Sequence, residues 1–309
     1  MTISESLKIA SAKLQPLKIA CAADKSLGRL EAEILLAHVL KKDRIWLLTH
    51  DQELLPSHER ATFESYVKRR AKHEPIAYIL GEKAFYGRDF LVNKHTLIPR
   101  PETEMMVVAA IEAHKAPPKA STLIWDVGTG SGAIAISLAA ELPDANILAS
   151  DVSEQALRLA RKNAKRHDVT KRIRFVKADL LNDPMKKILR SKKATPTSPQ
   201  HLIIAANLPY LPLSDKDVLD IDVTKYEPSS ALFCEREGLA LIIRFLDEVA
   251  FTRNTWAFNR ISLFFEFDPP QAKTLLSLAK KLFRNASITI EKDLAKRDRL
   301  LKIVITQVL

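Results

Sequence analysis

From residue 122 onward, short apolar segments alternate with segments of helical periodicity, and this alternation limits the possible folds more than any other feature of the chain. Alternating strands and helices form a mostly parallel sheet with helices on both faces. The last two strand-like segments follow one another closely, which predicts an antiparallel hairpin at one edge. We therefore expect an α/β fold. The strand-like segments are 122–127, 146–150, 172–177, 201–206, 261–267, 287–290 and 300–308, and the helical segments are 133–142, 154–166, 239–250 and 271–282.

The N-terminal part of the chain has a different character. Residues 1–80 contain helical segments, of which 26–40 is the clearest because its apolar residues recur at spacings of three and four. Two short alternating segments then flank Gly87, which is typical of a β-hairpin. We expect a helical domain over residues 1–80 and a second domain over residues 81–309 that begins with this hairpin.

Glycine is scarce in this chain, with seven among 309 residues, yet Gly128, Gly130 and Gly132 lie within five consecutive positions. This loop falls where the first strand of the predicted sheet turns into its first helix. Glycines permit a tight turn with positive φ and let the backbone approach a ligand closely, while the helix N-terminus offers free N–H donors. Asp151 ends the next strand, where a carboxylate can accept hydrogen bonds from both hydroxyls of a ribose. The pattern predicts a site for a nucleoside-containing cofactor.

The spacing of this glycine loop differs from that of dinucleotide-binding enzymes. The dinucleotide fingerprint requires Gly-x-Gly-x-x-Gly, whereas the loop here is Gly-x-Gly-x-Gly.

A second motif, Asn207-Leu208-Pro209-Tyr210, ends the fourth strand. The Asn207 amide and the Leu208 carbonyl can hold the NH2 group of a planar amide or of a base, and the Tyr210 ring can cover its flat face. Asn and Pro are also common where a strand ends in a plain turn.

Composition excludes several classes of protein. Two cysteines, Cys21 and Cys234, are too few for a disulfide framework and form no paired metal-binding pattern, which favours a reducing cytoplasm. We therefore expect no metal. We also expect no membrane-spanning segment, because no apolar run reaches the required length. The net charge of +11 favours contact with RNA-rich or acidic partners but defines no reaction.

At this point the chain resembles the HemK/PrmC family of S-adenosylmethionine-dependent methyltransferases, and the resemblance covers nearly the whole sequence. It rests on the glycine loop, on the acid after the second strand and on the tetrad at residues 207–210, together with motifs outside the predicted cofactor site. These are Glu31–Leu36, Glu74–Gly81, Phe85–Arg88, Ile98–Glu104, Tyr226–Pro228, Ala231–Phe233, Asp293–Ala295 and Arg297–Arg299.

The resemblance implies the class I methyltransferase fold, which is Rossmann-like with a seven-stranded, mostly parallel sheet, and which here has a small N-terminal all-helical domain and a connecting β-hairpin. It implies methyl transfer from S-adenosylmethionine to the side-chain amide nitrogen (N5) of the glutamine in the Gly-Gly-Gln motif of peptide chain release factors, leaving S-adenosylhomocysteine. The helical domain is then expected to recognise the release factor, and the enzyme to act as a cytoplasmic monomer.

Residue roles follow from the same resemblance. The cofactor-binding residues are expected to be Gly128, Thr129, Gly130, Ser131, Gly132, Asp151, Asp179, Leu180 and Asn207. The substrate-binding residues are expected to be Asn207, Leu208, Pro209 and Tyr210, with Asn207 and Tyr210 as the catalytic pair. Two positions depart from the family: Leu208 replaces the usual first proline of the tetrad, and the loop at residues 234–238 has less glycine.

Three alternatives stay open at the level of the sequence. An N6-adenine methyltransferase acting on nucleic acid would suit the basic charge and Leu208, because Asn-Leu-Pro-Tyr also occurs in ribosomal RNA adenine dimethyltransferases. A close relative could methylate a glutamine of a ribosomal protein. A non-catalytic nucleic-acid or ribosome-binding module would be expected to have lost Asn207 or Asp151, and both are present.

Overall fold

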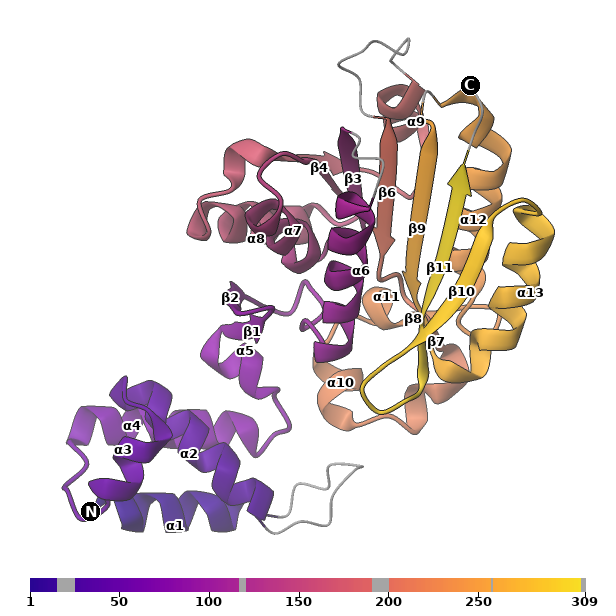
Figure 1. Cartoon of the computed structure of the whole chain (residues 1–309). Helices are drawn as coiled ribbons and strands as arrows, with labels where there is room; N and C mark the ends of the chain where they lie inside the picture. Colours follow the sequence, from indigo (N-terminus) through magenta and orange to yellow (C-terminus); the bar gives the residue numbers. More distant parts are fainter. Residues whose placement is uncertain (16–25, 117–120, 191–199, 257, 307–309) are drawn as a thin grey trace. The chain divides into compact units, whose positions relative to one another are not determined.

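The computed structural model describes residues 1–15, 26–116, 121–190, 200–256 and 258–306 (Figure 1). The chain divides into two compact units. The first contains Met1–Glu82 and Asp217–Glu227, and the second contains Lys83–Lys216 and Pro228–Leu309. Among the described residues, no helix is both long and apolar enough to cross a membrane.

A seven-stranded sheet forms the centre of the second unit. Its order is β10-β11-β9-β6-β3-β4-β5. The pairs β3–β4, β3–β6, β4–β5 and β6–β9 are parallel, while β11 is antiparallel to both β9 and β10. The predicted mostly parallel sheet with a C-terminal edge hairpin is therefore confirmed; residues 307 and 308 of the last expected strand lie outside the described residues. The strands are β3 (Thr122–Val127), β4 (Asn146–Asp151), β5 (Ile173–Lys177), β6 (His201–Ala206), β9 (Arg260–Glu266), β10 (Ser287–Lys292) and β11 (Asp298–Thr306).

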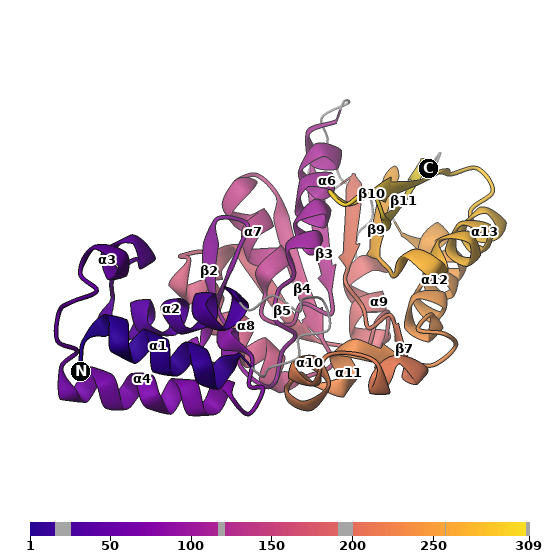
Figure 2. The same ribbon diagram turned by 90° about the horizontal axis from the view of Figure 1, so that it is seen from below.

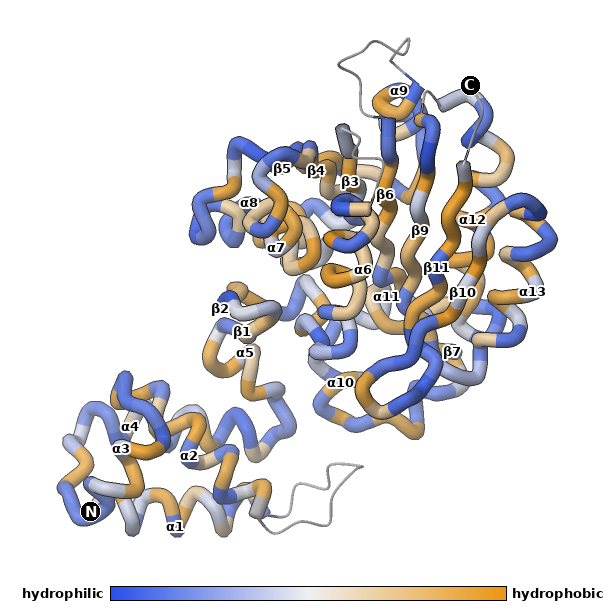
Figure 3. Tube along the Cα trace, in the orientation of Figure 1, coloured by the Kyte–Doolittle hydropathy of each residue, from blue (hydrophilic) through white to orange (hydrophobic). Residues whose placement is uncertain are grey.

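Helices cover both faces of this sheet because successive side chains of a strand point to opposite sides. Ile124 packs with α6 (Glu104–Lys115) and α7 (Ala133–Glu141), whereas its neighbour Trp125 packs with α12 (Ala240–Thr252) and α13 (Ala272–Leu282). Figure 2 shows these two helical layers from below. The middle strands are buried on both sides and consequently read as nearly continuous apolar runs, which Figure 3 shows for β6 and β9.

The second unit also contains a β-hairpin, the long helix α8 and several short elements. The predicted hairpin is present as β1 (Glu82–Phe85) and β2 (Arg88–Leu91), and its turn uses positive φ at Tyr86 and Gly87. The others are η1 (Pro101–Thr103), α8 (Glu154–Arg166), η2 (Thr170–Arg172), α9 (Asp183–Arg190), β7 (Leu211–Pro212), η3 (Leu213–Asp217), α11 (Ser229–Leu232), β8 (Phe233–Cys234), η4 (Arg253–Thr255) and η5 (Pro269–Gln271).

The first unit is helical and has its own apolar core. A buried arginine holds the distant segment 217–227 in this unit. The Arg70 side chain is 2% exposed, donates two hydrogen bonds to Glu31 and lies 2.6 Å from Asp222 Oδ2. The helices of this unit are α1 (Ile3–Leu14), α2 (Ser26–Leu40), α3 (Arg44–Thr49), α4 (Ser57–Arg70), α5 (Ile76–Leu80) and α10 (Ile221–Tyr226).

Replacing Arg70 by methionine is expected to destabilise the protein by about 3 kcal/mol, because two carboxylates would lose their buried partner. The matched control is Arg60→Met, which removes an exposed pair with Glu64 at 4.0 Å and is expected to cost less than about 0.5 kcal/mol. Urea unfolding followed by circular dichroism measures both. Equal losses in the two variants would contradict a stabilising role for the Arg70 network.

Candidate functional site

A cavity of about 400 Å³ lies at the carboxyl ends of the parallel strands in the second unit. Strands β4 and β5 follow β3 to one side of the sheet and β6 lies on its other side, so the chain order reverses at the β3–β6 pair. Ligands of open α/β sheets bind at such a reversal. The predicted site residues that line the cavity are Gly128, Thr129, Gly130, Ser131, Asp151, Asp179, Leu180, Asn207, Leu208 and Pro209.

The glycine loop is shaped by two different requirements. Gly130 has φ of +56°, and a Cβ added there would have only the Gly128 carbonyl within 4 Å, at 3.9 Å, so the space beside it is open. Gly132 has φ of +85°, and its Cβ would lie 2.8 Å from Ile136 Cδ1. Gly130 therefore leaves room for a ligand. Gly132 permits close packing at the start of α7 and does not line the cavity.

Asp151 ends β4 and shapes the loop from the side. Its Oδ2 accepts a hydrogen bond from the Gly130 N–H at 2.9 Å, and its Oδ1 accepts one from the Ser153 N–H at 2.8 Å. Burial raises the pKa of this carboxyl, and the backbone hydrogen bonds partly offset that rise. A carboxylate oxygen can accept more than one hydrogen bond, so Asp151 retains capacity toward the cavity.

Asp126, near the end of β3, is not among the predicted site residues, but its side chain holds the glycine loop through hydrogen bonds. It is fully buried, and its Oδ2 accepts hydrogen bonds from the Thr129 hydroxyl at 2.6 Å and the Ala135 N–H at 3.1 Å. Its Oδ1 has no hydrogen-bond partner among the described residues. Burial raises the pKa of Asp126 to about 7, far above that of an exposed aspartate.

Asp179 and Leu180 follow β5 at the far side of the cavity. Leu180 is buried and has a positive φ of +46°. Asp179 is more than half exposed and forms an ion pair with Arg244. Both residues line the cavity, and their expected place beside an adenine stays a prediction.

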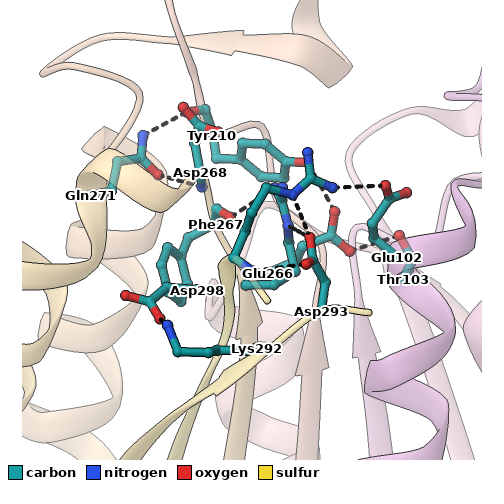
Figure 4. Close-up of polar contacts among 12 residues, drawn as sticks. Glu102, Thr103, Tyr210, Glu266, Phe267, Asp268, Gln271, Lys292, Asp293 and Asp298 are labelled. Carbon is teal, nitrogen blue, oxygen red and sulfur yellow. Dashed lines mark hydrogen bonds and ion pairs between the residues drawn. The ribbon is translucent and has the colours of Figure 1, made fainter. Parts of the chain in front are cut away.

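The tetrad at residues 207–210 is held by contacts on both of its sides. The Asn207 Nδ2 donates to Thr103 Oγ1 at 3.0 Å, while the Leu208 side chain is buried against Gly128. The Tyr210 hydroxyl donates to Glu266 Oε1 at 2.8 Å (Figure 4). Tyr210 is not among the lining residues, so its expected place over the flat face of the substrate stays a prediction.

The structure also explains the motif Ile98–Glu104. Its prolines stiffen an extended turn, and three of its side chains then reach different elements. Glu102 pairs with Arg297 at 3.4 Å, Thr103 donates to Glu266 Oε2 at 2.6 Å, and Glu104 accepts from the Tyr86 N–H at 2.8 Å. Thr103 is the one of these three that lines the cavity.

Glu266, the last residue of β9, is a buried carboxyl that sequence reasoning does not single out. Burial raises its pKa, while hydrogen bonds from Thr103 and Tyr210 and the nearby Arg299 guanidinium act in the opposite direction. Figure 4 shows Glu266 with its two partners, Thr103 and Tyr210. Among the described residues, no group of three or more His, Cys, Asp or Glu side chains is arranged to hold a metal ion.

Comparison with known proteins bears on the identity of both units. Residues 20–81 match the family described as PrmC N-terminal domain, and residues 124–191 match the family described as methyltransferase domain. The release factor glutamine methyltransferase of Nitratidesulfovibrio vulgaris is 40% identical over 71% of this chain and 69% of its own length. The corresponding protein of Chlorobaculum tepidum is 41% identical over 69% of this chain and 72% of its own length.

Other similar proteins are longer or more distant. The bifunctional methyltransferase of Rickettsia bellii is 37% identical over 68% of this chain but only 40% of its own length, so the chain spans less than half of that relative. Among solved structures, the hMettl16 catalytic domain in complex with an RNA hairpin has a TM-score of 0.52 at 15% identity, covering 81% of this chain and 82% of its own. That likeness concerns the fold.

The raised pKa of Asp126 predicts a pH-dependent stability. Because the folded state holds the Asp126 proton up to pH of about 7 and the unfolded chain releases it near pH 4, stability should fall as pH rises between those values. Three pKa units set an upper bound of roughly 4 kcal/mol on this effect. Asp126→Asn removes the titration, so the stability of the variant relative to wild type should increase from pH 4.5 to pH 8, as measured by urea unfolding.

Asp89→Asn, at an exposed position on β2, is the matched control and is expected to stay within about 0.5 kcal/mol of wild type at both pH values. A difference between Asp126→Asn and wild type that does not change with pH would contradict the assignment of a protonated, buried Asp126.

Proposed function

The chain belongs to the HemK/PrmC family of release factor glutamine methyltransferases, and from this premise we propose that it methylates the glutamine of the Gly-Gly-Gln motif in peptide chain release factors. The methyl group would come from S-adenosylmethionine and enter the N5 amide nitrogen of that glutamine. One observation carries the proposal: the glycine loop, Asp151 and Asn207 line a single cavity.

The residues around this cavity suit the proposed cofactor. When bound, S-adenosylmethionine supplies an activated methyl group. The open space beside Gly130 would admit its methionine part, and the backbone of residues 128–132 would contact it. Asp151 would accept hydrogen bonds from the ribose hydroxyls, and Asp179 and Leu180 would border the adenine.

Asn207 and Leu208 would orient the substrate. The nitrogen of an amide is a poor nucleophile because its lone pair is delocalised into the carbonyl group. The Asn207 Oδ1 and the main-chain carbonyl oxygen of Leu208 would accept hydrogen bonds from its two N–H groups and so stabilise positive charge that develops on the nitrogen. The Leu208 contribution is a backbone carbonyl, so leucine can serve where the family usually has proline. The new carbon–nitrogen bond would form as the carbon–sulfur bond to the methyl group breaks, leaving S-adenosylhomocysteine. The N-methylated amide would then carry a positive charge and be acidic enough to lose one N–H proton to water, so such positioning requires no strong base.

The proposed partner is therefore a release factor, with recognition by the first unit and a cytoplasmic site of action. The two other methyl-transfer candidates are outcomes of the same test. Incubating the chain with radiolabelled cofactor and a release factor is expected to label the factor stoichiometrically, whereas a factor carrying Gly-Gly-Ala should take up no label. Equal labelling of both factors, labelling of a ribosomal protein instead, or labelling of RNA alone would each refute the proposal.

Asn207→Ala is expected to lower kcat for the release factor by at least about 100-fold, because one of the two acceptors for the glutamine amide disappears. Circular dichroism and thermal unfolding should remain close to wild type. Asn259→Ala, at the opposite end of the sheet and exposed, is the matched control and should keep wild-type kcat. Near-normal turnover by Asn207→Ala would contradict the role of Asn207 as an acceptor for the glutamine amide.

A further inference from the structure

Asn207 stands at one end of a buried chain of hydrogen bonds. Its Nδ2 donates to Thr103 Oγ1 at 3.0 Å. The Thr103 hydroxyl in turn donates to Glu266 Oε2 at 2.6 Å (Figure 4). Thr103 is 4% exposed and Glu266 is 2% exposed, so bulk water does not replace these contacts. The three residues come from three separate parts of the sequence and meet beside the cavity.

The direction of these two hydrogen bonds follows from the groups that meet at Glu266. The two oxygens of Glu266 accept from the Thr103 and Tyr210 hydroxyls, and a hydroxyl has a single hydrogen to donate. Since Thr103 gives that hydrogen to Glu266, its oxygen can only accept from Asn207. The Asn207 amide must therefore turn its NH2 toward Thr103. Its Oδ1 is left for the cavity, and among the described residues none donates a hydrogen bond to it.

We propose that Thr103 and Glu266 are positioning residues that fix the Asn207 amide in the orientation the methyl-transfer reaction needs. The inference rests on the proposed function and deepens it. A flipped Asn207 would present its NH2 to the NH2 of the substrate glutamine, and two donors facing each other form no hydrogen bond. The Glu266 carboxylate thus determines, through one hydroxyl, whether the site offers an acceptor or a donor.

The surroundings of Glu266 support a dedicated role for this carboxylate. Its second oxygen, Oε1, accepts from the Tyr210 hydroxyl at 2.8 Å, so Glu266 holds the last residue of the tetrad directly and the first one through Thr103. The buried Arg299 lies near it and is itself held by the Phe267 carbonyl at 3.2 Å and by Asp293 at 3.6 Å. A buried ion cluster contributes little net stability compared with apolar packing, which favours a positioning function.

The far side of the tetrad is held independently. The Gln271 Nε2 donates to the Tyr210 carbonyl at 2.7 Å and to the Glu237 carbonyl at 2.8 Å. A Cβ at Gly238 would lie 1.9 Å from the Tyr210 carbonyl oxygen, so a side chain at that position would displace the loop. The backbone of the tetrad is thereby secured without Thr103, and loss of Thr103 should affect mainly the Asn207 side chain.

Thr103→Val tests the proposal, because valine keeps the shape of threonine and removes its hydroxyl. With a release factor as substrate, kcat is expected to fall roughly 10- to 100-fold. The KM for the release factor should change less than kcat, since one amide is a small part of the contact with a protein substrate. The Kd for S-adenosylhomocysteine should stay within about twofold of wild type, because the glycine loop and Asp151 are unchanged. Thr103→Ser should restore kcat to within about threefold, which a purely structural role for the threonine methyl would not allow.

Glu266→Gln is a second variant that keeps the shape of the site. Its NH2 can donate to Thr103, which frees the hydroxyl to donate to Asn207 and reverses the chain, so kcat is expected to fall as for Thr103→Val. Thr122→Val is the matched control: this buried threonine begins β3 at the opposite end of the sheet, and kcat should not change. Wild-type kcat in both Thr103→Val and Glu266→Gln would overturn the proposal; Thr103→Ala replaces Thr103→Val should the latter not fold.

A spectroscopic readout separates this proposal from the proposed function. The side-chain NH2 resonances of Asn207 in ¹⁵N-labelled protein can be assigned from their loss in Asn207→Asp. We expect them to shift in Thr103→Val and to stay unchanged in Thr122→Val. If wild type methylates no release factor while this shift occurs, the proposed function fails and the positioning holds. Unchanged Asn207 resonances in Thr103→Val would overturn the positioning, whatever the activity.

Discussion

The parallel pairing of β3 with β6 is the contact on which the candidate site depends. Its register places Val127 opposite Ala206, so the next residues of the two strands, Gly128 and Asn207, emerge side by side. A Cβ at Gly128 would lie 3.9 Å from the Asn207 carbonyl oxygen and 3.3 Å from the Leu208 side chain. A slip by one residue would turn every side chain of the strand to the other face. The cofactor loop and the substrate tetrad therefore share one cavity because this register is kept.

Much of the architecture is predictable from the sequence for a physical reason. Strands buried on both faces must be apolar throughout, and helices that cover them must repeat apolar residues every three or four positions. Both patterns are local, so the seven strands and the long helices are visible in the chain. Elements such as α10 and α11 are too short to show a period. The place of residues 217–227 depends on the contact between Arg70 and Asp222, which are 152 residues apart.

The same distinction applies to the site. Glycine, aspartate and asparagine at strand ends are recognisable because backbone shape and hydrogen bonding demand those residue types there. Thr103 and Glu266 are not recognisable in this way, since their importance comes from burial and from partners that lie far away in the sequence. Tyr210 is an intermediate case. The motif at residues 207–210 identifies it in the sequence, but no local pattern could reveal that its hydroxyl donates to Glu266.

The central claim is that Asn207 presents an oxygen, and Leu208 a second one, to the amide nitrogen of a glutamine. A crystal structure of the chain with S-adenosylhomocysteine and a release factor tests it most directly. We expect the glutamine nitrogen of the Gly-Gly-Gln motif within ~3.2 Å of both Asn207 Oδ1 and the Leu208 carbonyl oxygen. A glutamine bound outside this cavity, or one whose amide oxygen faces the Asn207 NH2, would contradict it.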